Sequence, residues 1–474
     1  MPTHTFLVRA AIPRVSSDAL FAWHERAGAF ERLAPPWEPV ALVSRAGTIR
    51  DGDETVLRLK MGPLGVRWRA RHEGYLPGRR FIDRQVAGPF RSWVHTHTTS
   101  PDEGGGATLE DRIDYELPLG ALGDRVLGRG IERRLTRMFN YRHATLANDL
   151  ERHRQAALPR QIIAVTGASG LIGRALCAFL ESGGHEVRRV VRHAPGPGEV
   201  QWDPDAGTID AAALTGVTAA VHLAGENISG GRWTAARKRK IEDSRVRGTN
   251  LFASTLAGLP VRPAVLVSAS AVGYYGTEPA PPHDEHSPPG DDFLAHVCKA
   301  WEDAAQPARD AGIRVVHPRF GVVLSPAGGA LGKMLTPFSM GAGGKIGKGT
   351  QPMSWVAIDD AVYAIHHALA TPAIGGPVNV VAPGVVTNAE FTKTLGHVLG
   401  RPTIVPLPGP IVKLLFGELG DTLLLHGQEV RPRALLESGF RFAHASLEDA
   451  LRHVLGRSTV PSRPEEARAI SSGT

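Results

Sequence analysis

Three glycines at three-residue spacing, Gly167, Gly170 and Gly173, separate an apolar segment from a helical one. Residues 162–166 form a short β-branched and apolar run, and residues 175–180 carry apolar side chains at helical spacing. At such a junction, free backbone N–H groups and the positive end of the helix dipole bind phosphate. The pattern therefore predicts a strand, a tight turn and a helix N-terminus that together hold the pyrophosphate of a dinucleotide.

The end of the next expected strand, residues 187–191, indicates which dinucleotide is bound. In such a unit, the position about 20 residues beyond the glycines contacts the ribose 2′-hydroxyl, and an acidic residue there favours NAD. This chain has Arg192 followed by His193. Both side chains can donate hydrogen bonds and carry positive charge, so we predict NADP, with NAD as the second choice. A solvated place in a loop is the alternative role for Arg192.

The chain after residue 161 alternates strands with helices, which predicts a parallel sheet. The strands that we expect are 162–166, 187–191, 219–223, 264–269, 313–316 and 378–380.

The first 154 residues have a different pattern, which predicts an α+β domain. A strand at 6–12 and a capped helix from Ser17 come first, and a long helix through Ile131 and Leu150 comes last. Between them, period-two runs separated by Gly/Pro turns predict an antiparallel meander. These runs are 54–60, 66–75, 81–86, 92–98 and 107–117.

The composition limits the classes of function. The chain has 474 residues, a net charge of +7 and 6% aromatic residues. The charge is spread along the chain, and the basic run 237–240 is followed by Glu242 and Asp243, so we expect a solvated helix face and no nucleic-acid binding. No apolar stretch is long enough for a membrane span. Two isolated cysteines, Cys177 and Cys298, and a start without an apolar leader predict a reduced, cytoplasmic protein.

The glycine spacing and several later segments resemble the extended short-chain dehydrogenase/reductases. The matching segments, in order, are 221–225, 265–270, 274–276, 318–324, 354–360 and 377–380. The resemblance implies a doubly wound α/β Rossmann fold that acts on a small-molecule substrate. It also implies these cofactor contacts: Thr166, Gly167, Ser169, Gly170, Leu171, Ile172, Gly173, Arg192, Leu223, Ala224, Gly225, Ser268 and Lys299.

Further segments resemble the atypical proteins called epimerase family proteins, or nucleoside-diphosphate-sugar epimerase-like proteins. These segments are 223–227, 230–234, 241–246 and 297–302. The stretch 417–451 is similar to the small domain of unknown function that ends those proteins.

The N-terminal part resembles the SRPBCC (START-like, polyketide-cyclase-like) helix-grip fold, through its element order and the segment 31–37. That resemblance implies an apolar cavity for a hydrophobic ligand, and a filled core is the alternative. The expected layout is a helix-grip domain at 1–154, a linker at 155–160, the Rossmann domain at 161–410, the C-terminal domain at 411–457 and a disordered tail at 458–474.

Catalysis in the wider family uses a Tyr-x-x-x-Lys helix for acid/base work and a serine that holds the substrate oxygen. Ser270 and Lys299 match the serine and the lysine, but Ala295 stands where the tyrosine is expected. The resemblance assigns catalysis to Ser270 and Lys299. Tyr275 and Tyr274, which leave the strand that carries Ser270, are the nearest candidate proton donors, with Tyr275 chosen and a structural role as the alternative. The alternative is a protein that binds NADP without efficient turnover.

Three histidines need separate treatment. His296, beside Ala295, could replace the tyrosine, but we expect it at the surface. His95 and His97 alternate on an expected strand and share one face. No third ligand accompanies them at a recognisable spacing, so we expect no metal.

Two functions remain open. One is an NADP-dependent oxidoreductase or epimerase that acts by hydride transfer on an unknown substrate. The other is an NADP-sensing or scaffold protein whose N-terminal domain binds a hydrophobic ligand or a partner.

Overall fold

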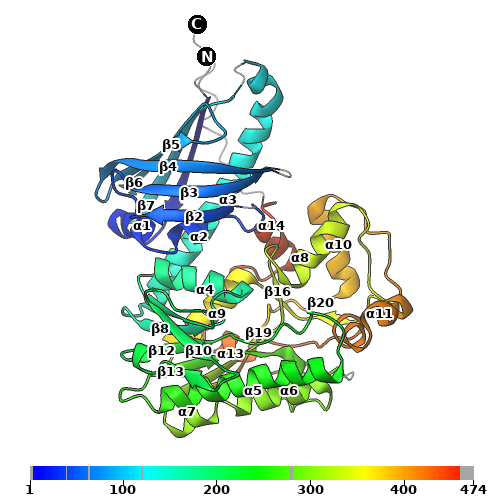
Figure 1. The fold of residues 1–474 in the computed structure, drawn as a ribbon. Helices are drawn as coiled ribbons and strands as arrows, with labels where there is room; N and C mark the ends of the chain where they lie inside the picture. The colour runs from blue at the N-terminus through cyan, green and yellow to red at the C-terminus, as the bar shows by residue number, and fades with distance from the viewer. Residues whose placement is uncertain (1–3, 39, 62–63, 119–120, 278–280, 459–474) are drawn as a thin grey trace.

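The computed structural model describes residues 4–38, 40–61, 64–118, 121–277 and 281–458. Figure 1 shows two lobes, an N-terminal sheet with one long helix above a larger layered α/β lobe. The expected disordered tail lies outside the described residues from position 459 onward. Among the described residues we find no helix with the length and apolarity needed to span a bilayer.

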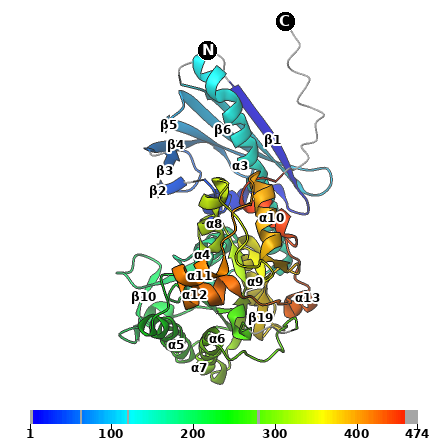
Figure 2. The ribbon, with the colours of Figure 1, turned by 90° about the vertical axis from the view of Figure 1, so that its right-hand side faces the viewer.

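The N-terminal lobe is a seven-stranded antiparallel sheet in the order β1-β7-β6-β5-β4-β3-β2. Its strands are β1 (His4–Ile12), β2 (Val40–Ala46), β3 (Glu54–Met61), β4 (Leu64–Leu76), β5 (Arg80–Ala87), β6 (Ser92–Pro101) and β7 (Ala107–Glu116). Its helices are α1 (Ser17–Glu25), α2 (Ala29–Leu33) and α3 (Ala121–Ala156). Figure 2 shows α3 along one face of this sheet, with its lower end reaching the second lobe.

The core of this lobe lies between the sheet and α3. Strands β6 and β7 alternate buried and more exposed residues, as a sheet with one covered face requires. Helix α3 buries Leu135, Phe139, Leu146 and Leu150, each worth roughly 1.5–3 kcal/mol of hydrophobic free energy. The predicted meander and long helix are confirmed, whereas the helix-grip assignment stays a prediction.

Two elements of this lobe were not predicted. Strand β2 is mostly exposed on both faces, so it lacks the period-two burial that reveals a strand. Helix α2 has five residues, too few for a helical repeat, and it follows Gly28 in the left-handed region.

The second lobe is built on a nine-stranded sheet in the order β11-β10-β9-β8-β12-β13-β15-β14, with β19 also paired to β15. Its strands are β8 (Ile162–Thr166), β9 (Glu186–Val191), β10 (Glu199–Asp203), β11 (Thr208–Ile209), β12 (Ala219–His222), β13 (Val265–Ser268), β14 (Ser270–Ala271), β15 (Arg314–Phe320) and β19 (Gly376–Val380). All six expected strands are present, and every pair except β10–β11 is parallel.

Helices cover both faces of this sheet. Helices α4 (Leu171–Ser182) and α9 (Ile358–Ala370) pack on one face, and α5 (Ala235–Ala257) and α7 (Gln306–Asp310) pack on the other. The remaining elements are η1 (Ala212–Leu214), η2 (Val272–Tyr275), α6 (Phe293–Asp303), β16 (Val322–Leu324), α8 (Gly329–Ser339), β17 (Pro352–Met353), β18 (Trp355–Ala357), β20 (Val386–Thr387), α10 (Asn388–Leu399), α11 (Gly409–Phe416), α12 (Glu418–Gly420), η3 (Asp421–Leu425), α13 (Arg433–Glu437) and α14 (Leu447–Val454).

The C-terminal segment joins cores that other elements build. Leu435 of α13 belongs to the core around α4 and α9, whereas Leu451 of α14 packs with α10 and β18. Leu419 of α12 packs with α5 and α6. The segment therefore wraps around the Rossmann lobe.

A buried ion-pair network joins the two lobes. Arg32 of α2 donates from Nε and Nη2 to the two carboxylate oxygens of Asp149 on α3, each at 2.7 Å. Arg32 Nη2 also lies 2.8 Å from Asp359 Oδ1 of α9. The hydroxyl of Tyr363 donates to Asp149 at 2.6 Å. Because breaking such a buried pair typically costs about 3–5 kcal/mol, these contacts favour a fixed arrangement of the lobes.

Candidate functional site: the glycine turn and the polar network beyond it

The glycine turn lies at the carboxyl edge of the parallel sheet, between β8 and α4. Gly167 has a φ of +67°, and a Cβ there would lie 2.7 Å from the carbonyl carbon of Leu223. A Cβ on Gly173 would lie 2.1 Å from the carbonyl oxygen of Gly167. Both positions therefore require glycine, which lets the turn fold tightly under the first turn of α4.

The start of α4 presents backbone donors to solvent. Gly170 is the N-cap of this 12-residue helix. Ser169 and Gly170 are exposed, and Leu171 and Ile172 are half-buried. These four predicted contacts therefore share the end of the helix where N–H groups lack intrahelical partners.

Two other predicted contacts, Thr166 and Ser268, lie completely buried beneath this surface. Thr166 Oγ1 lies 2.8 Å from Nδ1 of His222 and accepts the N–H groups of Leu223 and Ala224, both at 3.2 Å. Thr166 therefore fixes the end of β12 beside β8, and these partners occupy the hydroxyl that was predicted to contact the cofactor. Leu223 and Ala224 are half-buried and Gly225 is exposed beside the turn.

Basic side chains gather where the adenosine end of a dinucleotide is expected. Arg192 is exposed just beyond β9. Arg237 Nη1 donates to Glu226 Oε1 at 2.7 Å, and Lys240 Nζ lies 3.7 Å from Glu226 Oε2. The hydrogen bond from Arg237 and the charges of Lys240 and Arg192 lower the pKa of Glu226. The basic run 237–240, which was predicted to form a solvated helix face, and Arg192 therefore both lie near the carboxylate of Glu226.

A buried polar network lies beyond β13, at the expected catalytic end. Ser270 Oγ donates to Glu302 Oε1 at 2.7 Å. The same carboxylate binds Arg319 through both oxygens, at 2.8 and 2.9 Å. Arg319 Nη1 donates to the Tyr275 hydroxyl at 3.0 Å, and that hydroxyl donates to Asn379 Oδ1 at 2.7 Å. The sequence pattern selected Ser270 and Tyr275 from this chain of contacts and gave no role to the other three residues.

The surroundings shift the pKa values of two groups in this network, Arg319 and Tyr275. Burial alone lowers the pKa of Arg319, but Glu302 raises it above its usual value. Burial raises the pKa of Tyr275 to about 12. Tyr275 is 3% exposed and its hydroxyl is shared between two neighbours. This placement argues against the predicted role of Tyr275 as proton donor.

Tyr274, one residue earlier, is half-buried. The guanidinium carbon of Arg319 lies 3.4 Å from the centre of its ring. Lys299 on α6 is exposed, and its Nζ lies 2.6 Å from Asp303 Oδ2. Asp303, and more weakly Tyr274, raise the pKa of Lys299. The direct contact of Lys299 is therefore with Asp303, and Tyr274 acts on it only through a weaker electrostatic effect.

Helix α6, which corresponds to the helix that usually carries the catalytic tyrosine, contains no tyrosine. Ala295 is completely buried in α6, and Asp292 caps the helix by accepting the Ala295 N–H at 2.9 Å. His296 is exposed, and its Nδ1 lies 2.8 Å from the Asp292 carbonyl. The expectation that His296 lies at the surface is confirmed.

Comparison with known proteins identifies the protein family. Residues 163–382 match the NAD dependent epimerase/dehydratase family, and residues 407–454 match a domain of unknown function, DUF1731. The chain is 45% identical over 297 residues to an epimerase family protein of Mycobacterium bovis, covering 62% of this chain and 98% of that protein. The chain belongs to this epimerase family. It is also 40% identical over 296 residues to human epimerase family protein SDR39U1, covering 62% of this chain and 99% of the human protein.

Two solved structures of family members extend the comparison. A nucleoside-diphosphate sugar epimerase from Corynebacterium glutamicum is 35% identical and superposes with a TM-score of 0.80. The aligned region covers 97% of this chain and 91% of that one. The similarity therefore includes the N-terminal lobe. Human SDR39U1, crystallised with NADPH, is 40% identical and superposes with a TM-score of 0.58. The aligned region covers 62% of this chain and 98% of that one.

Proposed function

We propose that this epimerase family member is an NADP(H)-dependent oxidoreductase or epimerase of the short-chain dehydrogenase/reductase type. One observation carries the proposal. A glycine turn in which positions 167 and 173 exclude any side chain opens onto the free N-terminus of α4, with Arg192 exposed beyond the neighbouring strand. The human relative crystallised with NADPH supports the same choice of dinucleotide.

The cofactor residues divide into two groups. Gly167, Gly170 and Gly173 let backbone N–H groups approach the pyrophosphate. Arg192, with Arg237 and Lys240 near it, offers positive charge to the 2′-phosphate, and charge-assisted hydrogen bonds of this kind are roughly twice as strong as neutral ones. Bound NADP(H) supplies or accepts hydride at C4 of its nicotinamide.

The Ser270 hydroxyl can accept a hydrogen bond from a substrate but cannot donate one. Its only hydroxyl proton is donated to Glu302, so the remaining lone pairs of Oγ accept a hydrogen bond. A substrate hydroxyl, which can donate, fits this arrangement better than a bare carbonyl. Ser270 therefore orients an alcohol oxygen, or the carbonyl only after it gains a proton.

Tyr274 supplies the proton in our proposal. Tyr274 is half-buried, Arg319 lies against the face of its ring, and the charge of Tyr274 acts weakly on Lys299. General acid–base catalysis contributes about 10²–10⁴-fold. The phenylalanine variant Tyr274→Phe should therefore lose about that factor in kcat.

The test compares Tyr274→Phe with the matched variant Tyr275→Phe in NADPH oxidation against a panel of carbonyl compounds. The proposal expects turnover in the wild type, a large loss of kcat without Tyr274, and unchanged NADPH affinity in both variants. Equal activity of Tyr274→Phe and wild type would overturn the role of Tyr274. Absence of turnover across the panel would support the second function below.

The second function is an NADP-sensing or scaffold protein. Buried Ala295 in place of the usual tyrosine, and the pairing of Lys299 with Asp303, favour it. In that case NADPH binds tightly and changes the thermal stability of the chain, and Ser270→Ala alters neither. A turnover that falls in Ser270→Ala excludes this second function.

A further inference from the structure

Titratable side chains from four strands meet on the α3-facing side of the N-terminal sheet. His95 and His97 alternate on β6 and are buried. Asp83 of β5 lies directly opposite His95, and Asp111 of β7 lies directly opposite His97. His72 of β4 is buried beside Asp83. The register of the sheet, which sequence spacing does not reveal, brings these residues together.

Sequence spacing showed no third ligand for His95 and His97, but the folded sheet places a carboxylate beside them. One ligand atom each from Asp83, His95 and His97 lies within 4.8 Å of the others. His97 Nε2 lies 3.4 Å from Asp83 Oδ2. In a tetrahedral zinc site with bonds near 2.0–2.1 Å, ligand atoms lie roughly 3.3 Å apart. The separation of the imidazole and the carboxylate already fits such a site.

His72 offers a fourth ligand atom. Its Nδ1 lies 2.6 Å from Asp83 Oδ1. Both atoms are buried, and neither has a hydrogen-bond partner of acceptable geometry. The two groups form an ion pair at this distance, but a poorly aligned contact does not fully compensate for their lost hydration. A tetrahedral ion would hold these two atoms roughly 3.3 Å apart, so His72 joins the site only after a small shift of its side chain.

Asp111 lies on the other side of the same imidazoles. Its Oδ1 lies 3.0 Å from His95 Nε2 and 2.7 Å from His97 Nδ1, and its Oδ2 lies 2.8 Å from His143 Nε2. Carboxylates that contact the far nitrogen of a metal-binding histidine orient the ring and raise its basicity. One nitrogen of each ring, His95 Nε2 and His97 Nδ1, thus faces Asp111. The second nitrogen of each ring, such as His97 Nε2, is left for an ion.

The local charge favours a cation. The carboxylates of Asp83 and Asp111 lie on either side of the His97 imidazole, at 3.4 and 2.7 Å from its two nitrogens. The nearby guanidinium of Arg142 donates from Nε to the Leu33 carbonyl at 3.1 Å and does not pair with either carboxylate. The side chain of Asp83 is 28% exposed, which provides a route from solvent.

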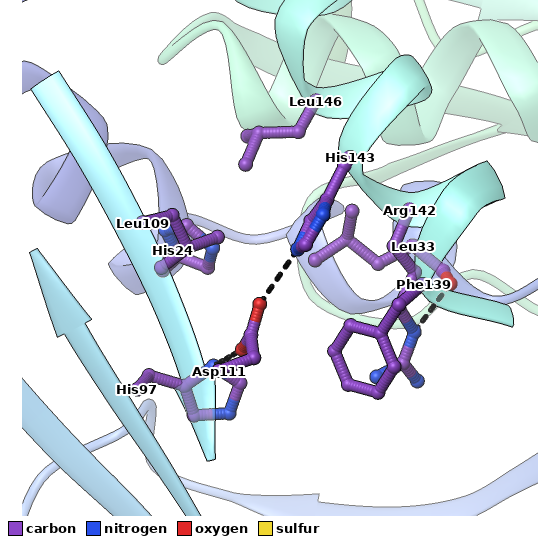
Figure 3. Close-up of a pocket in the computed structure, with 9 residues that line it drawn as sticks. All are labelled: His24, Leu33, His97, Leu109, Asp111, Phe139, Arg142, His143 and Leu146. Carbon is purple, nitrogen blue, oxygen red and sulfur yellow. Dashed lines mark hydrogen bonds and ion pairs between the residues drawn. The ribbon is translucent and has the colours of Figure 1, made fainter. Parts of the chain in front are cut away.

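The space next to this cluster is small. Figure 3 shows the cavity between α3 and the sheet, where His24, His97, Asp111 and His143 approach one another. Its volume is about 10 Å³, which is room for one water molecule. This cavity therefore does not accommodate the hydrophobic ligand that the family resemblance implies for the lobe.

We propose that the N-terminal lobe binds one divalent transition-metal ion, with Zn²⁺ as the best-fitting ion. The ligands are Asp83, His95 and His97, and His72 or a water molecule completes the coordination. Two or three imidazoles with one carboxylate are ligands that zinc prefers. This site is independent of the nucleotide site in the other lobe.

The experiment strips the full chain with a chelator and titrates it with Zn²⁺ by calorimetry and with Co²⁺ by visible absorption. We expect one ion per chain and intense visible Co²⁺ bands typical of tetrahedral coordination. Asp83→Asn and His95→Gln should each weaken binding at least about tenfold. The matched control Asp114→Asn should bind like the wild type, because Asp114 pairs with Arg112 on the same sheet, away from the cluster.

Three results would overturn the proposal. The first is a wild-type chain that binds no stoichiometric ion and gives no tetrahedral Co²⁺ spectrum, a measurement that needs no variant to fold. The second is unchanged binding in folded Asp83→Asn and His95→Gln, with folding checked by circular dichroism. The third is binding lost in His366→Gln instead, since His153, His185 and His366 form another cluster with the spacing of metal ligands.

Discussion

The two ends of the nucleotide site differ in how their polar groups are used. At the glycine turn, Ser169 and Gly170 are exposed and the N-terminus of α4 points its amides outward. At the other end, Ser270, Glu302 and Arg319 are buried and bonded to one another. The first end is therefore ready for a ligand, whereas the second has partners for its polar groups within the protein.

This difference separates binding from chemistry in one fold. Nucleotide binding needs backbone amides and close approach, which the glycines provide. Proton transfer needs a side chain poised for it, and the usual tyrosine is replaced by buried Ala295. The network around Glu302 then sets the donor and acceptor roles that remain for a substrate.

The largest expected effect comes from removing the charge at the centre of the closed end. Glu302→Gln leaves the buried Arg319 guanidinium without its carboxylate, and an unpaired buried charge costs about 3–5 kcal/mol. Chemical denaturation measures the free energy of unfolding. The control Asp303→Asn removes an exposed partner of Lys299 and should change stability by at most about 1 kcal/mol. Equal effects of the two variants would contradict a structural role for Glu302.

The next effect tests the open end. The Cβ of Gly173→Ala would lie 2.1 Å from the Gly167 carbonyl oxygen, so the turn must move. Backbone strain of this kind costs roughly 1–3 kcal/mol, and we expect NADPH affinity by calorimetry to fall about 10–100-fold. The control is Gly258→Ala at the end of α5, where a Cβ meets only ordinary contacts at 3.5 Å or more. An intact affinity in Gly173→Ala would show that the pyrophosphate binds elsewhere.

These comparisons also show what the sequence could predict. The six expected strands of the nine-stranded Rossmann sheet and the glycine turn are local patterns, because each depends on residues close together in the chain. Glu302, Arg319 and Asn379 were missed as a network because they come from different elements and meet only in the folded sheet. Asp83 was missed for the same reason, since strand register alone places it opposite His95.

His222, which contacts Thr166 beneath the glycine turn, should make the free energy of unfolding depend on pH. Burial lowers the pKa of His222 to about 3, whereas an unfolded histidine titrates near 6.5. The unfolded chain therefore binds more protons between these values, so this contribution is complete above about pH 6.5 and falls as pH drops. At about pH 5.5 the loss is about 1.4 kcal/mol. Chemical denaturation of the wild type and His222→Asn at about pH 5.5 and about pH 6.5 measures this loss. The unfolding free energy of the variant should depend less on pH, and an equal pH dependence in both proteins would contradict this role of His222.

The most direct test of the account concerns the phosphate that distinguishes the two dinucleotides. Calorimetry with NADPH and NADH, on the wild type, Arg192→Ala and the exposed-arginine control Arg262→Ala, measures it. We predict tighter binding of NADPH by the wild type and the control. Arg192→Ala should lose about tenfold in NADPH affinity, a charge-assisted contact of about 1.4 kcal/mol, with NADH affinity unchanged. Equal affinity of the wild type for both dinucleotides, or a variant that weakens both alike, would contradict the account.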